Sequence, residues 1–534
     1  MNRTRSTKLH ALVAVGLAAA LVAGCSSAES GGGGKQDAVD LSSIREGFLG
    51  KDKGGDAVEG GTLSMASFAE PRSLDPAVTI AALTTGGSEM LNIYDSLMRY
   101  DANDQSFVPQ MAEGISTEDN ITWTLKLRDG VLFSDGSTLD SAAVKASQER
   151  YASMPAPEAA LWNANVTTVE TPDASTVVYT LNKPWVQFPG ILTTGPGMIV
   201  GKASGAGETF KPVGAGPFTL GKWAPQESLT LDARKDYWGG KPKLDAVKFV
   251  YLPNAQTAID SQAKGEIDVA FIREPNQVED ALKNDPHGVV NMTAAQNSAL
   301  INASEGRPGA DPRVRKAMQL AIDTQLLTER AFSGAGGGSP TIFPEYSRWH
   351  GKTQGLAYDP EAAKKLLAEA KADGFDGKIE YTDGSDPASR ETALAVKALL
   401  EAVGFEVETV LTRTVADLIT KVVVDRDYDV SAWGHSFREP DPIPKMFAIL
   451  HSTGTQLYGS QTSPEMDALL EKFQVAPTYE EQKAVMDEIQ QRVNEDVPFL
   501  TFGPYAETVL WNDNVRGVLG AGNSMVLYAK AWKS

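Results

Sequence analysis

Cysteine, histidine and basic residues are all scarce in this sequence. A single cysteine, Cys25, in 534 residues excludes an internal disulfide, so stability has to come from packing. The five histidines form no HExxH motif and show no other zinc-ligand spacing. Lysine and arginine number 49 against 69 acidic residues, and a net charge of −20 repels phosphate backbones. We therefore expect no metal site, no cofactor and no nucleic-acid partner.

Long apolar runs are also missing, apart from one near the N-terminus. Residues 11–24 are uncharged, follow three basic residues, and are shorter than the roughly 20 residues that span a bilayer. They end in LVAG directly before Cys25, which resembles the lipobox of bacterial lipoproteins. The resemblance implies a signal peptide at 1–24, lipidation of Cys25 and anchoring on the extracytoplasmic face of the cell membrane. The glycine-rich residues 25–61 are predicted to be a flexible tether in which little packs.

Length and composition indicate a folded chain of several compact units. At about 150 residues per domain, 534 residues give roughly three units. Hydrophobic residues at 42% and charged residues at 22% are close to globular averages, which excludes a disordered chain, a coiled coil and a polytopic membrane protein.

The local patterns predict an α/β protein. Gly404 stands where a helix would end, and 405–411 then alternate apolar and polar residues as a half-buried strand does. Further strands are predicted in the first half, at 122–127, 176–181, 247–251 and 267–272. Helix starts with an N-cap residue are predicted at Asp311, Asp359, Asp386, Ser463 and Thr478.

Two segments of the sequence nearly match known catalytic motifs. Residues 216–222 read GxxxxGK, but Trp223 replaces the Ser or Thr that would hold Mg²⁺, and the segment reads as a strand. Ser261 and Lys264 fit SxxK, the nucleophile motif of penicillin-binding proteins, without an SDN or KTG partner. No GxSxG occurs. We predict that the chain is not an enzyme, and a secreted serine acylase remains the less favoured alternative.

A series of short motifs resembles the family 5 extracellular solute-binding proteins of ABC importers, the oligopeptide, dipeptide and nickel-binding group. Each motif alone is weak, but their common order along residues 62–532 is specific. The motifs are EPRSLDP at 70–76, YDSL at 94–97, WTL at 123–125, LRDGV at 127–131, FSDG at 133–136, PVGAGPF at 212–218, YW at 237–238, GEID at 265–268, VRKA at 314–317, AID at 321–323, and YD at 428–429 leading to Trp433.

The resemblance implies an α/β, periplasmic-binding-protein-like fold of type II, cluster C, with two lobes and an extra subdomain in the larger lobe. Lobe I is expected at 62–296 plus 503–534, with the subdomain at about 92–207, and lobe II at 297–502. The implied function is that of a monomeric, lipid-anchored receptor that captures peptides between the lobes and delivers them to a permease with its ATPase subunits. A non-peptide ligand, namely a modified peptide, an oligosaccharide or a chelated metal, is the alternative within this class.

Two segments of the sequence, residues 69–73 and 432–434, match the family's ligand contacts. The resemblance implies that they flank the ligand as an added β-strand does, with Trp433 offering a flat face. Relatives that take free peptides place an aspartate three residues after this tryptophan, whereas this chain has Ser436. Either another residue, such as Glu70, His435, Glu439 or Asp441, receives the ligand's amine, or the ligand has no free N-terminus. The candidate ligand-binding residues are Ala69, Glu70, Pro71, Arg72, Ser73, Ala432, Trp433, Gly434, His435, Ser436 and Phe502.

Overall fold

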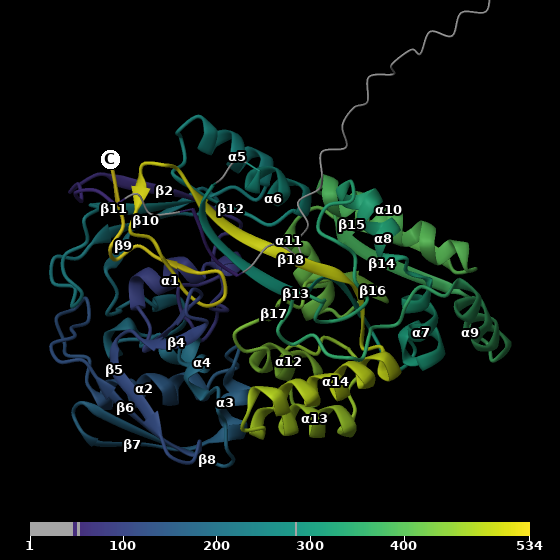
Figure 1. The fold of residues 1–534 in the computed structure, drawn as a ribbon, viewed down its shortest axis with the longest axis horizontal. Helices are drawn as coiled ribbons and strands as arrows, with labels where there is room; N and C mark the ends of the chain where they lie inside the picture. The colour runs from purple at the N-terminus through teal and green to yellow at the C-terminus, as the bar shows by residue number, and fades with distance from the viewer. Residues whose placement is uncertain (1–45, 51–53, 284–285) are drawn as a thin grey trace, which may run out of the picture. The chain divides into compact units, whose positions relative to one another are not determined.

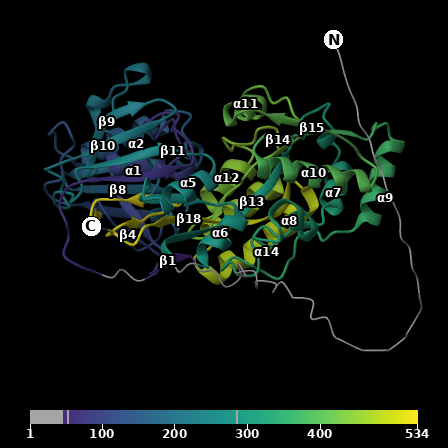
Figure 2. The same cartoon turned by 90° about the horizontal axis from the view of Figure 1, so that it is seen from above.

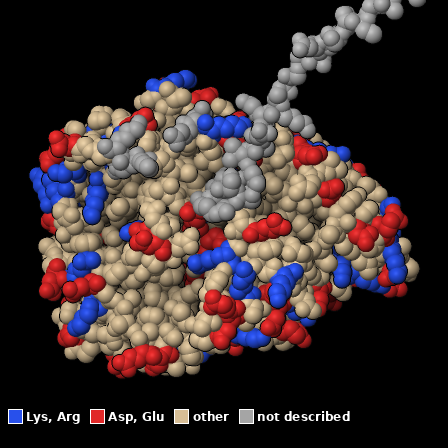
Figure 3. All heavy atoms as spheres, viewed as in Figure 1, with Lys and Arg blue, Asp and Glu red and all other residues tan. Residues whose placement is uncertain are grey.

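The computed structural model describes residues 46–50, 54–283 and 286–534. The predicted signal peptide, Cys25 and the tether up to residue 45 lie outside the described residues, and the described residues belong to one compact unit. Within the described part of the chain no helix is long and apolar enough to cross a membrane. On the face shown in Figure 3, lysine and arginine lie interspersed with aspartate and glutamate, so the acidic excess does not gather there in one patch.

A 12-stranded sheet forms the centre of the fold (Figure 1), and two long antiparallel strands, β13 (His287–Ile301) and β18 (Phe499–Trp511), join its two halves. The strand order is β15-β14-β16-β13-β18-β12-β2-β11-β10-β9, with β1 and β17 also paired to β13. Each half has its own apolar core.

The first half of the sheet contains β2 (Thr62–Ser67), β9 (Phe218–Ala224), β10 (Ser228–Ala233), β11 (Ala246–Tyr251) and β12 (Val269–Ile272). Alternate residues of β2 and β12 point to opposite faces of this half. Helices α5 (Ala255–Ala263) and α6 (Pro275–Leu282) cover one face, and α1 (Gly87–Tyr94) packs against the other (Figures 1 and 2). The C-terminal segment contributes to the apolar core of this half, and its short strands form two separate two-stranded sheets. The first pairs β19 (Val515–Arg516) with β22 (Trp532–Lys533), and the second pairs β20 (Leu519–Gly520) with β21 (Val526–Leu527).

The second half contains β14 (Lys378–Gly384), β15 (Glu406–Thr412), β16 (Val430–Ala432) and β17 (Phe437–Arg438). Its helices are α7 (Pro312–Ala321), α8 (Thr324–Phe332), α9 (Pro360–Ala372), α10 (Pro387–Ala402) and α11 (Val415–Ile419), which a π-helical turn at Thr420–Val424 extends.

A third group of elements shares a single apolar core, which residues 97–199 build together with three later helices. The first part comprises the hairpin of β3 (Met98–Asp101) and β4 (Ser106–Pro109), the sheet of β5 (Ala112–Thr117), β6 (Thr122–Leu127), β8 (Thr176–Leu181) and β7 (Val166–Asp173), and helices α2 (Ser141–Ala152), α3 (Ala159–Asn165) and α4 (Phe188–Ile191). The later helices are α12 (Ile443–Leu450), α13 (Pro464–Val475) and α14 (Tyr479–Asp496).

The helix starts predicted from capping residues are confirmed. At each of the five positions the N-cap side chain accepts a hydrogen bond from a backbone N–H in the first turn. Gly404, with φ +107°, follows the C-cap of α10, as a helix-ending glycine does. The strands predicted at 122–127 and 176–181 coincide with β6 and β8, and 216–222 runs into the strand β9 rather than a phosphate-binding loop.

The prediction that little packs before residue 62 is wrong for one short segment. Strand β1 (Gly47–Leu49) pairs with β13, and the Phe48 ring meets the Trp511 ring edge-on at 6.2 Å. A three-residue strand has no periodicity to detect, and its partner lies about 240 residues further along the chain.

The glycines of the PVGAGPF motif are explained by a close approach of two backbones. A Cβ on Gly214 would lie 2.2 Å from the carbonyl oxygen of Ile93 at the end of α1, and one on Gly216 would lie 2.5 Å from that of Asn92. The Gly216 amide also donates to the Ile93 carbonyl at 2.8 Å. The motif therefore serves packing against α1.

Gly214→Ala is expected to lower the free energy of unfolding by about 1–3 kcal/mol, because a backbone carbonyl cannot move aside as a side chain can. Urea denaturation of the purified protein measures this. Gly114→Ala is the matched control, since nothing lies within 4 Å of a Cβ there. An equal effect of the two substitutions would contradict the packing explanation.

Candidate functional site

The strands of both halves end toward the middle of the β13–β18 ladder. In the first half, β12 is parallel to β2 and ends at Ile272, opposite Thr508 of β18. In the second half, β16 is parallel to β14 and ends at Ala432, opposite Ala299 of β13. Ligands of open α/β sheets bind outside the carboxyl ends of the strands. The topology therefore places the candidate site at the midpoint of this ladder.

A β-bulge interrupts β13 at this midpoint. Thr293 pairs with Tyr505 and Ser298 with Thr501, so β13 takes five steps where β18 takes four. Ala295 has a φ of +48°. Gln296 and Asn297 are the only residues of β13 that are partly exposed, and Tyr505 is the only such residue inside β18. Three polar side chains thus reach the surface of an otherwise buried strand pair.

The segment with Trp433 is hydrogen-bonded to the bulge. The Trp433 amide donates to the Ser298 carbonyl at 3.0 Å, and the Ser298 hydroxyl donates to the Trp433 carbonyl at 2.5 Å. The half-buried Trp433 ring meets Tyr458 edge-on at 5.6 Å. Trp433 is therefore held beside the partly exposed midpoint.

Gln296 lies against the residues that follow Trp433. The Ser436 hydroxyl donates to Gln296 Oε1, and Ser436 adopts a left-handed φ of +53°. A Cβ on Gly434 would lie 2.3 Å from Gln296 Nε2, so only glycine fits there without displacing the amide. Both Gln296 and Ser436 are half-buried.

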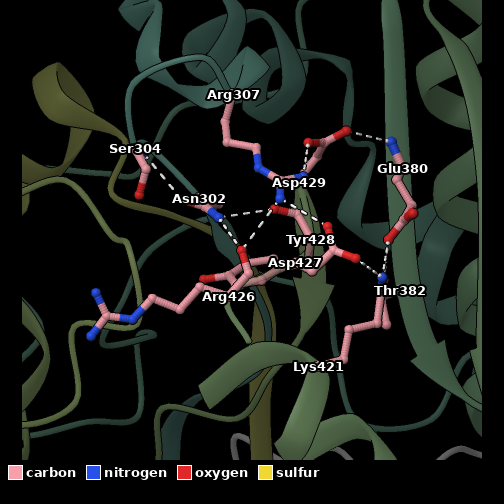
Figure 4. A network of polar contacts seen from close by, with 10 residues as sticks. All are labelled: Asn302, Ser304, Arg307, Glu380, Thr382, Lys421, Arg426, Asp427, Tyr428 and Asp429. Carbon is pink, nitrogen blue, oxygen red and sulfur yellow. Dashed lines mark hydrogen bonds and ion pairs between the residues drawn. The ribbon is translucent and has the colours of Figure 1, made fainter. Parts of the chain in front are cut away.

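A polar network anchors the chain that leads into β16 (Figure 4). Arg307 forms ion pairs with Asp427 at 2.9 Å and Asp429 at 3.3 Å. The Asn302 side-chain amide donates to the carbonyl of Tyr428 at 3.0 Å. These contacts fix the strand that presents Trp433.

Two of the predicted site residues are fully buried. His435 packs against the rings of Phe437 and Phe499, and neither ring nitrogen has a partner among the described residues. Burial lowers the pKa of His435 to about 3, so the ring is neutral at neutral pH. Phe502 lies in the apolar core of the second half, and its carbonyl accepts a hydrogen bond from the Ser339 amide at 2.9 Å.

The opening segment, residues 69–73, makes its contacts elsewhere. Glu70 accepts hydrogen bonds from Trp223 Nε1 at 2.6 Å and from the Gln226 amide at 3.0 Å, which tie it to the β9–β10 hairpin. Ala69 is half-buried, Pro71 is buried, Arg72 is exposed and Ser73 closes a turn with Thr79. In the described ranges no hydrogen bond, ion pair or ring contact joins this segment to residues 432–436.

Sequence reasoning missed the polar residues that the topology brings to the midpoint. Arg273 follows β12, and its guanidinium lies 4.0 Å from the centre of the Phe68 ring. Asp383, near the end of β14, accepts from the Gly384 amide at 2.7 Å, and burial raises its pKa to about 7. No motif marks these positions. The sequence indicates them only through their position, since Arg273 directly follows a buried strand and Asp383 stands near the end of one.

Further acids and a buried ion pair lie along β17 and the residues after it. Burial raises the pKa of Asp441 to about 7 and also raises that of Glu439. Arg438 Nη1 binds Glu507 Oε2 of β18 at 2.8 Å, and the Ser524 hydroxyl donates to the same oxygen. Among the residues that the structure describes, no group of three or more His, Cys, Asp or Glu could hold a metal ion.

Comparison with known proteins identifies the class. The model of the bacterial extracellular solute-binding proteins, family 5, matches residues 106–456, and the chain belongs to this family. The predicted family resemblance is thereby confirmed. The glutathione-binding protein GsiB of Salmonella paratyphi A is 32% identical over 294 residues, 53% of this chain and 57% of that protein. The chain spans about half the length of the curated relatives it matches.

Solved structures confirm the predicted α/β fold of type II periplasmic binding proteins. The oligopeptide-binding protein AppA from Bacillus subtilis, in complex with a nonapeptide, superposes with a TM-score of 0.77 at 20% identity, covering 90% of this chain and all (100%) of that one. AgaA of A. tumefaciens, in complex with agropinic acid, gives a TM-score of 0.75 at 25% identity, covering 89% of this chain and 99% of that one.

Proposed function

We propose that this chain is the substrate-binding lipoprotein of an ABC importer, which captures peptides between two lobes and delivers them to a membrane permease. The observation that carries the proposal is the convergence of strand ends from both halves on the partly exposed midpoint of the β13–β18 ladder. Family membership and the fold shared with a nonapeptide-bound protein support it. The proposal includes a lipid anchor at Cys25, a monomeric protein and ATPase partners of the permease.

The lobes of the proposal follow the two crossing strands. Lobe I comprises residues 62–296 and 503–534, with a subdomain at about 92–207, and lobe II comprises 297–502. Both boundaries fall in the interrupted part of the ladder, between Thr293 and Ser298 on β13 and between Thr501 and Tyr505 on β18. A ligand that touches both lobes stabilises their closed arrangement, and a shift from 1:99 to 99:1 requires about 5.5 kcal/mol of differential affinity.

Catalysis has no part in the proposal. Ser261 and Lys264, the residues of the acylase alternative, lie at the end of α5, where Lys264 is exposed and serves as the C-cap. No described contact joins the Ser261 hydroxyl to the Lys264 amine. A fluorescent penicillin that labels the protein, and that Ser261→Ala abolishes, would reinstate the alternative.

Native mass spectrometry of the purified protein tests the ligand class. A series of short-peptide masses is expected, together with a smaller radius of gyration in solution scattering when peptide is added. A single non-peptide mass would instead favour the second candidate, an importer receptor for a non-peptide ligand, namely a modified peptide, an oligosaccharide or a chelated metal. That candidate is supported by the likeness to AgaA with agropinic acid and by Ser436 at the position where relatives place an acid.

Trp433→Ala is expected to weaken peptide binding by about 2 kcal/mol, roughly 30-fold, because a half-buried aromatic face at a binding site carries a disproportionate share of the affinity. Isothermal titration calorimetry measures the effect. Trp532→Ala, which removes a half-buried tryptophan in β22, is the control and should leave the affinity unchanged. Equal affinities of the Trp433→Ala variant and the wild type would remove this residue from the site.

A further inference from the structure

The Gln296–Ser436 pair presents hydrogen-bond donors without charge. Because the Ser436 hydroxyl donates to Gln296 Oε1, the orientation of the glutamine amide is fixed. Gln296 Nε2 then keeps its N–H groups available, since it has no hydrogen-bond partner among the described residues, and Gln296 is half-buried. A fixed amide nitrogen at a partly exposed position suits a carbonyl or another neutral acceptor.

The surroundings of this pair offer no counter-charge for a cation. His435, between Gly434 and Ser436 in the sequence, is neutral and packs against two phenylalanine rings. Ala294 and Ala295 on the β13 side are buried and apolar. An ammonium group that lost its water here would face only neutral dipoles, and an unpaired charge is far more costly to bury than a neutral polar group.

Five carboxylates near the midpoint or in the opening segment could in principle pair with an amine, and each is bound elsewhere through at least one oxygen. These partners are Trp223 for Glu70, Gly384 for Asp383, Arg348 for Glu439, Ile443 for Asp441 and Arg438 for Glu507. Glu439 Oε1, Asp441 Oδ2 and Glu507 Oε1 are buried and have no hydrogen-bond partner among the described residues. Within the described ranges, no hydrogen bond or ion pair joins any of these carboxylates to Gln296 or Ser436.

We infer that the ligand group that reaches Gln296 and Ser436 is an uncharged hydrogen-bond acceptor, such as the acyl carbonyl of an N-blocked peptide, and not a free α-ammonium. The inference rests on the proposed function and deepens it by naming the chemical class of peptide. Gln296 and Ser436 are its specificity-determining residues: the amide nitrogen donates to the acceptor, and the serine orients the amide.

A matched competition tests the inference. A random-sequence tetrapeptide library and its N-acetylated copy are mixed in equal amounts with the purified protein, and bound masses are compared by native mass spectrometry. The wild type is expected to enrich the acetylated copies at least tenfold. Equal or stronger binding of the free peptides overturns the inference and leaves the proposed function standing. Binding of neither set overturns the proposed function, and the inference with it.

Substitution at Ser436 separates specificity from folding. Ser436→Asp supplies the missing negative charge and is expected to reverse the preference in favour of free peptides. Ser436→Ala removes the hydroxyl that orients the Gln296 amide without adding charge, so it should reduce the preference for acetylated peptides but not reverse it. Circular dichroism verifies that each variant is folded. If the aspartate variant is not folded, the ratio of acetylated to free peptides bound by the wild type tests the inference. A folded Ser436→Asp variant with the wild-type ratio would overturn the inference.

Discussion

Arg438→Met is expected to destabilise the fold by about 3–5 kcal/mol, because it leaves the carboxylate of Glu507 buried without its counter-charge. Arg438 and Glu507 are 2.8 Å apart, and their side chains are only 11% and 1% exposed. The pair joins β17 to β18, and Ser524 near the C-terminus binds the same carboxylate. Urea denaturation measures the loss as a shift of the midpoint at constant slope.

Two controls decide whether the buried charge causes this loss. The double variant Arg438→Met, Glu507→Leu removes both charges and should recover most of the stability. Lys472→Met breaks an exposed pair with Glu488 and should cost no more than about 1 kcal/mol. A loss for Arg438→Met as small as that for Lys472→Met would show that the charge of Glu507 is neutralised by other means.

The free energy of unfolding is expected to fall as the pH rises from 6.5 to 8. Burial raises the pKa of Glu89, Asp383 and Asp441 to about 7 and that of Glu46 to about 8. In the unfolded chain these carboxyl groups titrate near pH 4, so over this window the folded state binds more protons. Stability therefore decreases with pH, by about 1.4 kcal/mol per pH unit for each excess proton.

The titration of His435 sets the lower end of this pH range. Its pKa is lowered to about 3 in the fold, so below pH 6.5 the unfolded state takes up a proton that the folded state does not, and this opposes the effect of the acids. Glu89→Gln should make the decline in stability shallower by roughly 0.4 proton averaged over the window, because Glu89 is fully buried and titrates near pH 7 in the folded state. Glu391→Gln, on the exposed side of α10, is the control. A stability that rises between pH 6.5 and 8 would contradict the prediction.

Local features of this fold were predictable from sequence, and long-range ones were not. The N-caps at Asp311, Asp359 and Asp386 depend on neighbouring residues, so their patterns specify the helices that are found. By contrast, β13 is buried along nearly its whole length and shows no alternation that would mark its faces. The pairing of β1 with β13 depends on residues far apart in the sequence, and so does the apolar core shared by residues 97–199 and α12–α14.

The candidate site was predictable only in part for the same reason. The motif around Trp433 marks a stretch of chain whose backbone is hydrogen-bonded to the bulge of β13. The bulge itself, with Gln296 and Asn297 turned outward, has no marker in the sequence, because a register shift is a property of two strands together. Phe502 lies beside the predicted crossing between the lobes, but the pleat of β18 directs its ring into the core.

The bulge in β13 also bears on how chain length is tolerated. Within the bulge, β13 has one residue more than the facing stretch of β18. On either side of it, the residues of the two strands pair as they do in a regular antiparallel ladder. We expect deletion of Gln296 to preserve the β13–β18 pairs on both sides of the bulge and the pair between Ala294 and Phe437 of β17. The shortened protein would have a continuous ladder between β13 and β18. Comparing it with the natural chain would separate the effect of the extra residue on movement of the lobes from its effect on folding of the sheet.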